Sequence, residues 1–113
     1  MKIIKDEITL NELKQLAESK FGNFVKAVVD IQAGIMAVDA ELHADEEALL
    51  IENGSKQQDL WGINIYPELS SNDLIEFDSM INLKPAQGNR SRGVESQAIR
   101  TQIVRIVSNL IKP

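Results

Sequence analysis

The chain contains no cysteine, and this absence excludes several kinds of chemistry. Without a thiol there is no disulfide, no thiolate ligand for a metal ion and no cysteine nucleophile. Disulfides are rare in reducing compartments, so a chain without cysteine fits the cytoplasm. We expect a cytoplasmic protein.

Long apolar segments are missing as well. No run approaches the roughly 20 apolar residues that a transmembrane helix needs, so we expect no membrane insertion. Residues 1–7 have neither a long apolar stretch nor a small-residue cleavage site, which predicts no signal peptide. The 113 residues are enough to bury a core without disulfides or metals, and we expect one soluble domain over residues 1–113.

Positive charge is scarce along most of the chain and concentrated near its end. Residues 1–82 hold 16 acids and 6 bases, whereas residues 83–113 hold 6 bases and Glu95 as the one acid. The overall charge of −5 argues against general coating of nucleic acids. The asymmetry indicates either a basic binding face or a basic C-terminal helix that pairs with the acidic remainder, and we favour the pairing.

Two amphipathic helices are predicted, one near each end of the chain. Thr9 and Glu12 fit a capping box, and apolar residues at helical spacing follow over residues 10–21. A second helix is predicted over residues 95–111. Its wide apolar stripe consists of Ile99, Ile103, Ile106, Val107 and Leu110.

Between the helices, alternation of apolar and polar residues predicts strands. A further segment, 47–52, fits a strand because Asn53-Gly54 is a strong hairpin signal, while the acids before it leave a helix as the alternative. Residues 2–4 fit either a short edge strand or an irregular start. The sum is an α+β fold, an antiparallel sheet of four or five strands packed on an N-terminal and a C-terminal helix in two layers. The other predicted strands are 24–31, 35–42, 59–66 and 75–83.

The loop before the last helix carries groups suited to an anion. Its glycines allow positive φ, its arginines offer forked donors, and the helix behind it presents free N–H groups. We predict that this loop binds a small anion or an acidic partner. The alternative is that the arginines pair with acids such as Asp78 or Glu95 and the loop only turns the chain. The predicted binding residues are Lys84, Gln87, Gly88, Asn89, Arg90, Ser91 and Arg92.

His43 is the only histidine, and Glu41 and Asp45 lie two residues to either side. On an extended strand the three side chains would share one face, successive members about 6.5–7 Å apart, so a carboxylate could orient the imidazole. Such a group could act as acid and base, and Glu41 and Asp45 with Glu46 or Glu47 could hold Mg²⁺. The alternative is a solvated strand end with one hydrogen-bonding histidine. A single histidine without cysteine argues against zinc, and we predict no metal and no cofactor.

Polar residues on the last predicted strand lead into the loop. Asp78 and Asn82 lie on its outward side, so we expect them to line any cleft beside the loop. Serines at 55, 79 and 91 are available as nucleophiles, although no nucleophile-elbow pattern surrounds them. Trp61, the single tryptophan, is expected in the core.

Three blocks of the sequence resemble a known family. They are Glu41-Leu42-His43-Ala44-Asp45, Asp59-Leu60-Trp61-Gly62 and Asn82-Leu83-Lys84-Pro85 followed by Gln87-Gly88-Asn89-Arg90-Ser91. Over nearly its whole length the chain resembles a family of small bacterial and archaeal proteins that is labelled only as a domain of unknown function. The resemblance implies no activity. Lys84 departs from the arginine common at this position, which keeps the charge but loses bidentate geometry.

Two functions follow as hypotheses. The first is a binding module that recognises an anionic ligand or an acidic protein partner through residues 87–92. The second is a small hydrolase in which Glu41, His43 and Asp45 act on a substrate held by Arg90 or Arg92. The second requires His43 and an arginine in one pocket. The acidic strands argue against nucleic acid, and an open sheet edge is compatible with a homodimer.

Overall fold

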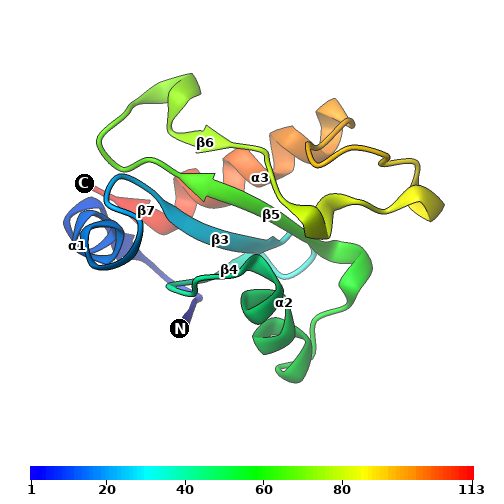
Figure 1. The fold of residues 1–113 in the computed structure, drawn as a ribbon, viewed down its shortest axis with the longest axis horizontal. Helices are drawn as coiled ribbons and strands as arrows, with labels where there is room; N and C mark the ends of the chain where they lie inside the picture. Colours follow the sequence, from blue (N-terminus) through cyan, green and yellow to red (C-terminus); the bar gives the residue numbers. More distant parts are fainter.

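The centre of the fold is an antiparallel sheet (Figure 1). The computed structural model describes the backbone of residues 1–113 and every side chain except that of Ser71. Across these residues the sheet has five strands in the order β1-β4-β3-β5-β6. They are β1 (Lys2–Ile4), β4 (Ile35–Val38), β3 (Val25–Asp30), β5 (Leu60–Ile65) and β6 (Ile75–Glu76). A short parallel pair, β2 (Ile8–Thr9) with β7 (Ile111–Lys112), joins the two ends of the chain.

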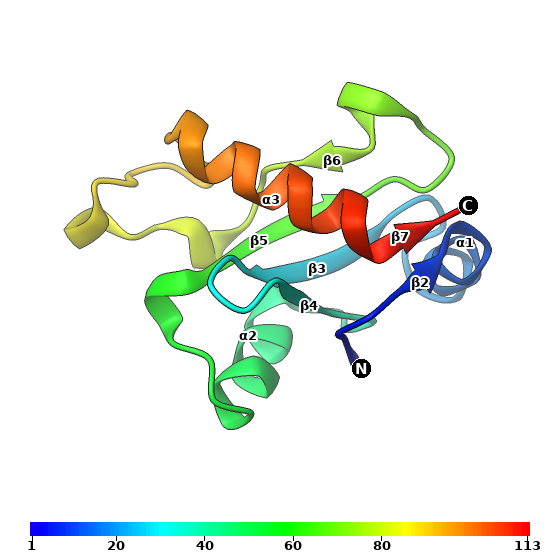
Figure 2. The same ribbon diagram turned by 180° about the vertical axis from the view of Figure 1, so that it is seen from behind.

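One face of the sheet is covered by α1 (Leu10–Lys20) and α3 (Gln97–Leu110). Figure 2 shows α3 lying across the strands, with α1 near its C-terminal end. The core between these layers includes Leu13 of α1, Trp61 of β5 and Ile103 of α3, all almost fully buried. The predicted α+β fold with an N-terminal and a C-terminal helix on the sheet is confirmed. The capping box also forms, since the Glu12 amide donates to the Thr9 hydroxyl at 3.1 Å.

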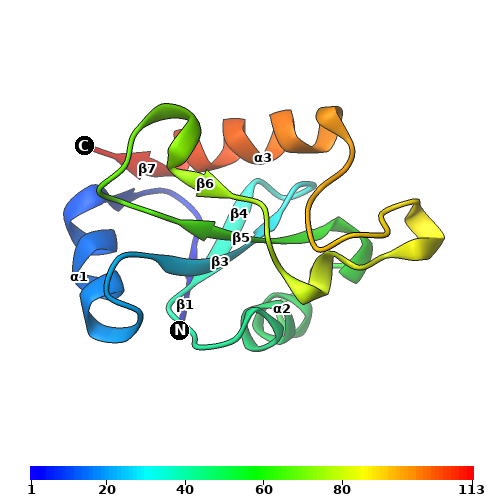
Figure 3. The ribbon, with the colours of Figure 1, turned by 45° about the horizontal axis from the view of Figure 1, so that its top comes forward.

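A third helix, α2 (His43–Glu52), packs on the opposite face of the sheet (Figure 3). The strand predicted over residues 47–52 is therefore wrong, and the helical alternative is correct. The buried positions of α2 are His43, Glu46 and Leu50. Two of these three are polar, so the helical stripe is invisible to an analysis of apolar spacing. Asn53-Gly54 ends α2 instead of forming a hairpin, with Gly54 at φ 102°.

The last predicted strand, 75–83, is also wrong beyond Glu76. The chain leaves the sheet there and forms a 3₁₀ turn, η3 (Met80–Asn82), in which the Ser79 hydroxyl accepts from the Ile81 amide at 3.3 Å. The Asn82 side chain takes over the hydrogen bonds to β5 that this part of the predicted strand would have made. Its Oδ1 accepts from the Gly62 amide at 2.8 Å and its Nδ2 donates to the Gly62 carbonyl at 3.0 Å. An amide side chain thus makes the bonds that a strand backbone would have made.

The remaining differences concern strand ends. β4 stops at Val38, four residues before the predicted end, because Asp39 takes a left-handed conformation at φ 73°. Residues 2–4 do form an edge strand, paired with β4. Within the described chain, no helix is both long and apolar enough to cross a membrane.

Candidate functional site

Asn89 organises the loop between η3 and α3. Its side chain is buried, its Nδ2 donates to the carbonyls of Asn82 and Gly93 at 2.8 Å each, and its Oδ1 accepts from the Glu95 amide at 2.8 Å. The backbones of Lys84 and Asn89 also pair in both directions, at 2.8 and 3.1 Å. The loop is therefore closed by its own hydrogen bonds.

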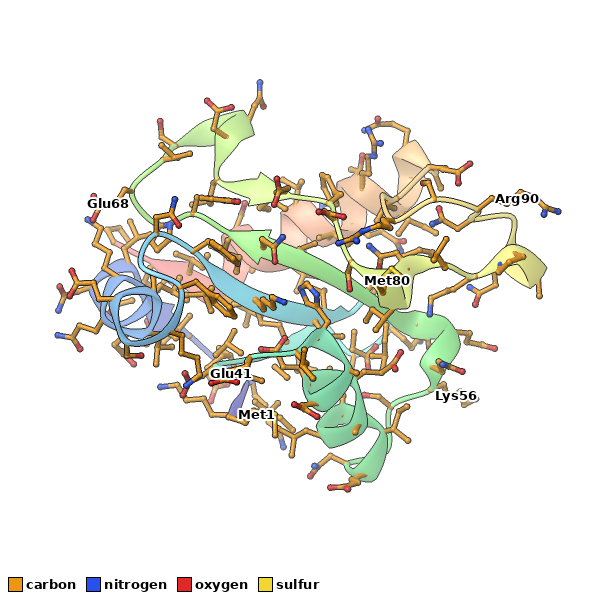
Figure 4. The ribbon with its side chains drawn as sticks, in the orientation of Figure 1. Met1, Glu41, Lys56, Glu68, Met80 and Arg90 are labelled. Carbon is orange, nitrogen blue, oxygen red and sulfur yellow. The ribbon has the colours of Figure 1, made fainter. Side chains whose placement is uncertain are left out.

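The backbone amide of Arg90, one of the residues predicted to bind an anion, already contacts a carboxylate of the same chain. Glu95 Oε2 accepts from the Arg90 amide at 2.6 Å. This bond is the main reason why the pKa of Glu95 lies below its ordinary value, and bonds from Ser91 add to it. The Arg90 side chain lies at the outer tip of the loop, away from the sheet (Figure 4).

Lys84 and Gln87 attach the loop to η1 (Gln57–Asp59). Lys84 Nζ donates to the Gln57 carbonyl at 3.0 Å and lies 5.3 Å from the centre of the Trp61 ring. Burial lowers the pKa of this amine. Gln87 Nε2 donates to the Gln58 carbonyl at 3.1 Å. In this arrangement both side chains make structural contacts.

Arg92 is the member of the loop that turns toward α2. Its carbonyl accepts from the Ser79 amide and from Asn82 Nδ2, both at 2.9 Å, which fixes this segment beside η3. Its Nε donates to Asp78 Oδ1 at 2.7 Å. Both side chains of this ion pair are about half exposed. The rest of the guanidinium is not in an ion pair with any described acid.

His43 opens α2 and contacts β5. Its Nε2 lies 2.8 Å from the Ile63 carbonyl, which can only accept, so Nε2 carries the proton and Nδ1 is the nitrogen with a free lone pair in the neutral ring. Burial is the largest cause of a lowered pKa at His43, partly offset by the bond to Ile63. The imidazole is therefore neutral at pH 7, with Nδ1 available as an acceptor or base.

His43 and Arg92 share a hollow of about 170 Å³ at the N-terminal end of α2. We call it the α2 hollow. Met80, on η3 at its rim, is labelled in Figure 4. The hollow brings together side chains from β3, α2, η3 and the segment before α3. It is lined by Lys26, Leu42, His43, Ala44, Ser79, Met80, Ile81 and Arg92.

The start of α2, which lines this hollow, also has backbone N–H groups without a partner in the described part of the chain. Leu42 occupies the N-cap position and has no side chain that can accept from the first turn. Among the hydrogen bonds of the described residues, none is made by the amides of His43 and Ala44. The helix dipole places partial positive charge at the same end. The α2 hollow is therefore lined by two cationic side chains and a neutral imidazole at the positive end of a helix dipole. The Lys26 ammonium also lies 5.2 Å from the centre of the Phe21 ring.

Several predicted site residues lie outside the α2 hollow. Glu41 and Asp45 are exposed and do not line it, and the expected common face of an extended strand does not exist because His43 begins a helix. Asn82 is fully buried against Gly62, and Asp78 pairs with Arg92. Of the residues expected in a shared pocket, the structure unites His43 and Arg92.

Of two further residues in this region, Lys26 was not predicted, and Glu46 was considered only as a possible Mg²⁺ ligand. Lys26 lies on β3 on the side of α2, and Glu46 lies one helical turn after His43, fully buried. A lysine within an apolar strand and a His-x-x-Glu spacing were the available signals. The Ala40 amide donates to Glu46 Oε2 at 3.1 Å, whereas Oε1 has no partner among the described residues. Burial raises the pKa of Glu46 to about 9, so this side chain is neutral at pH 7.

Ser79 is poorly suited to act as a nucleophile. It is 1% exposed and packs on Gly62, where an added Cβ would lie 2.5 Å from the Ser79 hydroxyl. Within the described part of the chain, no group of three or more histidine, cysteine or acidic side chains could hold a metal ion. The chemistry that this site supports directly is recognition of a negative group.

The expected neutralisation of the basic C-terminal helix is not found among the described side chains. Arg92 pairs with Asp78, but Arg100 and Arg105 form no ion pair there. Arg100 instead donates to the Val94 carbonyl and lies 5.5 Å from the centre of the Phe77 ring. Much of the positive charge near the C-terminus therefore remains available to solvent or a partner.

Comparison with known proteins gives a family but no function. The profile of a family described as "Protein of unknown function (DUF5674)" matches residues 2–110. No curated protein matches the chain, and no solved structure does. The likeness to a domain of unknown function is thus confirmed.

Proposed function

We propose that this chain, which belongs to the DUF5674 family of proteins of unknown function, is a binding module that holds an anionic group in the α2 hollow. The observation that carries the proposal is the convergence of Lys26 and Arg92 on His43 at the uncapped start of α2. A carboxylate or phosphate there would meet two positive side chains and the positive end of a helix dipole. The loop at residues 87–92 contributes through Arg92 and fixes its position.

The single histidine supplies the test. Its ring protons can be followed by NMR as pH changes, without assignment, in the presence of acetate, succinate, phosphate or sulfate. An anion in the α2 hollow favours the protonated imidazole, so each ligand that binds there should raise the pKa of His43. A pKa of His43 that stays the same in all four anions at tens of millimolar would refute the proposal.

The two arginines of the loop provide a matched pair of variants. Arg92→Gln should weaken anion binding by about tenfold or more, because a charge-assisted contact is lost. Arg90→Gln should leave binding unchanged, because Arg90 lies at the outer tip of the loop. Weaker binding in Arg90→Gln together with unchanged binding in Arg92→Gln would place the anion site at the tip of the loop instead. Loss of the exposed Arg92–Asp78 pair costs folding only about 0–1 kcal/mol, so the Arg92 variant should remain folded.

A second function uses the same histidine as a general base. His43, whose neutral ring keeps its free lone pair on Nδ1, lines the same hollow as Arg92, so it could activate water against an ester or phosphoester held by the arginine. Hydrolysis of p-nitrophenyl acetate and p-nitrophenyl phosphate tests this function. Turnover should fall as pH decreases, with its midpoint at the NMR pKa of His43, and it should vanish in His43→Gln. Anion binding without turnover would refute the hydrolase function and retain only the binding function.

A further inference from the structure

The rim of the α2 hollow is unusually apolar for a surface. Leu42 is 56% exposed and Met80 is 63% exposed, and both line the hollow directly. Exposed large apolar side chains that gather around a polar centre are typical of protein interaction sites. This rim is the first sign that the natural occupant is larger than a free anion.

A second hollow of about 220 Å³ adjoins the first across η3. Ile81 lines both, and the second hollow also presents Leu83, which is 40% exposed, and Pro85. The apolar surface therefore continues from Leu42 over η3 to Leu83. Basic side chains lie within it at Lys26 and Arg92.

The size of the hollows decides between occupants. Pockets that enclose whole small ligands span about 300–1,000 Å³, and each of these two hollows is smaller. A space of this size fits one side chain, with the rest of the occupant lying on the rim. The net charge of −5 argues against a nucleic acid as that occupant.

We infer that the α2 hollow and η3 form a docking surface for an acidic segment of a partner protein. An aspartate or glutamate of the partner enters the α2 hollow toward Lys26 and Arg92, and a neighbouring apolar side chain covers Met80 and the second hollow. A buried charged contact surrounded by apolar contacts that exclude water is the usual arrangement of a binding hot spot. This inference rests on the proposed function, since it names the molecule that carries the anion.

Random peptides displayed on phage test the inference. Selection on the wild-type protein, with Arg92→Gln as the counter-selecting bait, should enrich peptides that carry an acid next to a large apolar residue. A synthetic copy of one enriched peptide is then titrated against the variants. Its affinity should fall about tenfold or more in Arg92→Gln and in the double variant Leu42→Ser with Met80→Ser. Replacing the acid of the peptide by its amide should have the same effect.

Val104→Ser is the matched control, because Val104 is an apolar side chain of α3, 44% exposed, outside both hollows. It should leave peptide affinity unchanged. Sulfate should still raise the pKa of His43 in the Leu42→Ser, Met80→Ser variant. That readout separates failure of the docking surface from failure of anion binding.

Three results would overturn the inference. The first is no enrichment over Arg92→Gln, and the second is peptide binding that depends on Val104 rather than Met80. The third is a different occupant: a dimer in analytical ultracentrifugation, or binding of fluorescent oligothymidine, that disappears in the Leu42→Ser, Met80→Ser variant.

Discussion

Glu46 is an acid in a place where the fold disfavours its charge. It is fully buried between α2 and the sheet, and burial raises its pKa to about 9 from an ordinary 4.5. The folded protein therefore binds a proton that the unfolded chain releases at neutral pH. Stability contributed by this group is complete below pH 4.5 and declines until pH passes about 9.

Replacing Glu46 by glutamine should remove this dependence. Within the declining range, each pH unit costs the folded state about 1.4 kcal/mol, so Glu46→Gln should stabilise the protein by about 2–4 kcal/mol at pH 7.5. Urea unfolding between pH 5 and pH 9 measures the effect. Glu52→Gln, at an exposed position of the same helix, is the control and should preserve the slope. An unchanged slope in Glu46→Gln would show that this side chain is ionised in the folded state.

At the scale of elements, the loop from η3 to α3 owes its length to internal hydrogen bonding. A strand-to-helix connection commonly needs about two to six residues. This one spends more because Asn89 satisfies carbonyl and amide groups on both sides of it, and Asn82 joins the loop to β5. The polar residues from which we predicted a ligand site thus mainly hold the loop together, and in doing so they fix the position of Arg92.

Asn89→Ala should damage this element severely. It leaves the Asn82 and Gly93 carbonyls and the Glu95 amide without their partner, so we expect a loss of about 3 kcal/mol in the free energy of unfolding. Gln87→Ala removes one exposed bond, to the Gln58 carbonyl, and should cost below about 1 kcal/mol. Denaturant titration compares the two. Similar losses in both variants would mean that Asn89 does not hold the loop together.

At the scale of the whole molecule, the net positive charge around the α2 hollow decreases as pH rises. The groups near it that bear on an anion are Lys26, His43, Asp78 and Arg92, and Glu46 lies one turn along α2. His43 gains positive charge below its lowered pKa, and Glu46 gains negative charge near pH 9. A bound anion favours the first ionisation and opposes the second.

Sulfate binding should therefore tighten as pH falls below 6.5, the ordinary pKa of histidine, and weaken as pH approaches 9. Sulfate keeps its own charge over this range, so isothermal titration at constant ionic strength reports the protein groups. His43→Gln should abolish the low-pH gain and Glu46→Gln the high-pH loss. Affinity that is flat with pH would place the anion away from both groups.

The local pattern of the sequence determined the two outer helices, the central strands and the buried Trp61, because apolar periodicity and capping residues act over a few neighbouring positions. Only the tertiary structure decided the state of α2, since its buried face contains His43 and Glu46, whose polarity hides the helical stripe. Only packing, likewise, brought Lys26 to His43 and Arg92, residues from three separate segments. Packing also placed the Glu95 carboxylate on the Arg90 amide, within the loop predicted to bind an anion. The sequence does not show whether a backbone amide will bond to a carboxylate of its own chain or to one of a ligand.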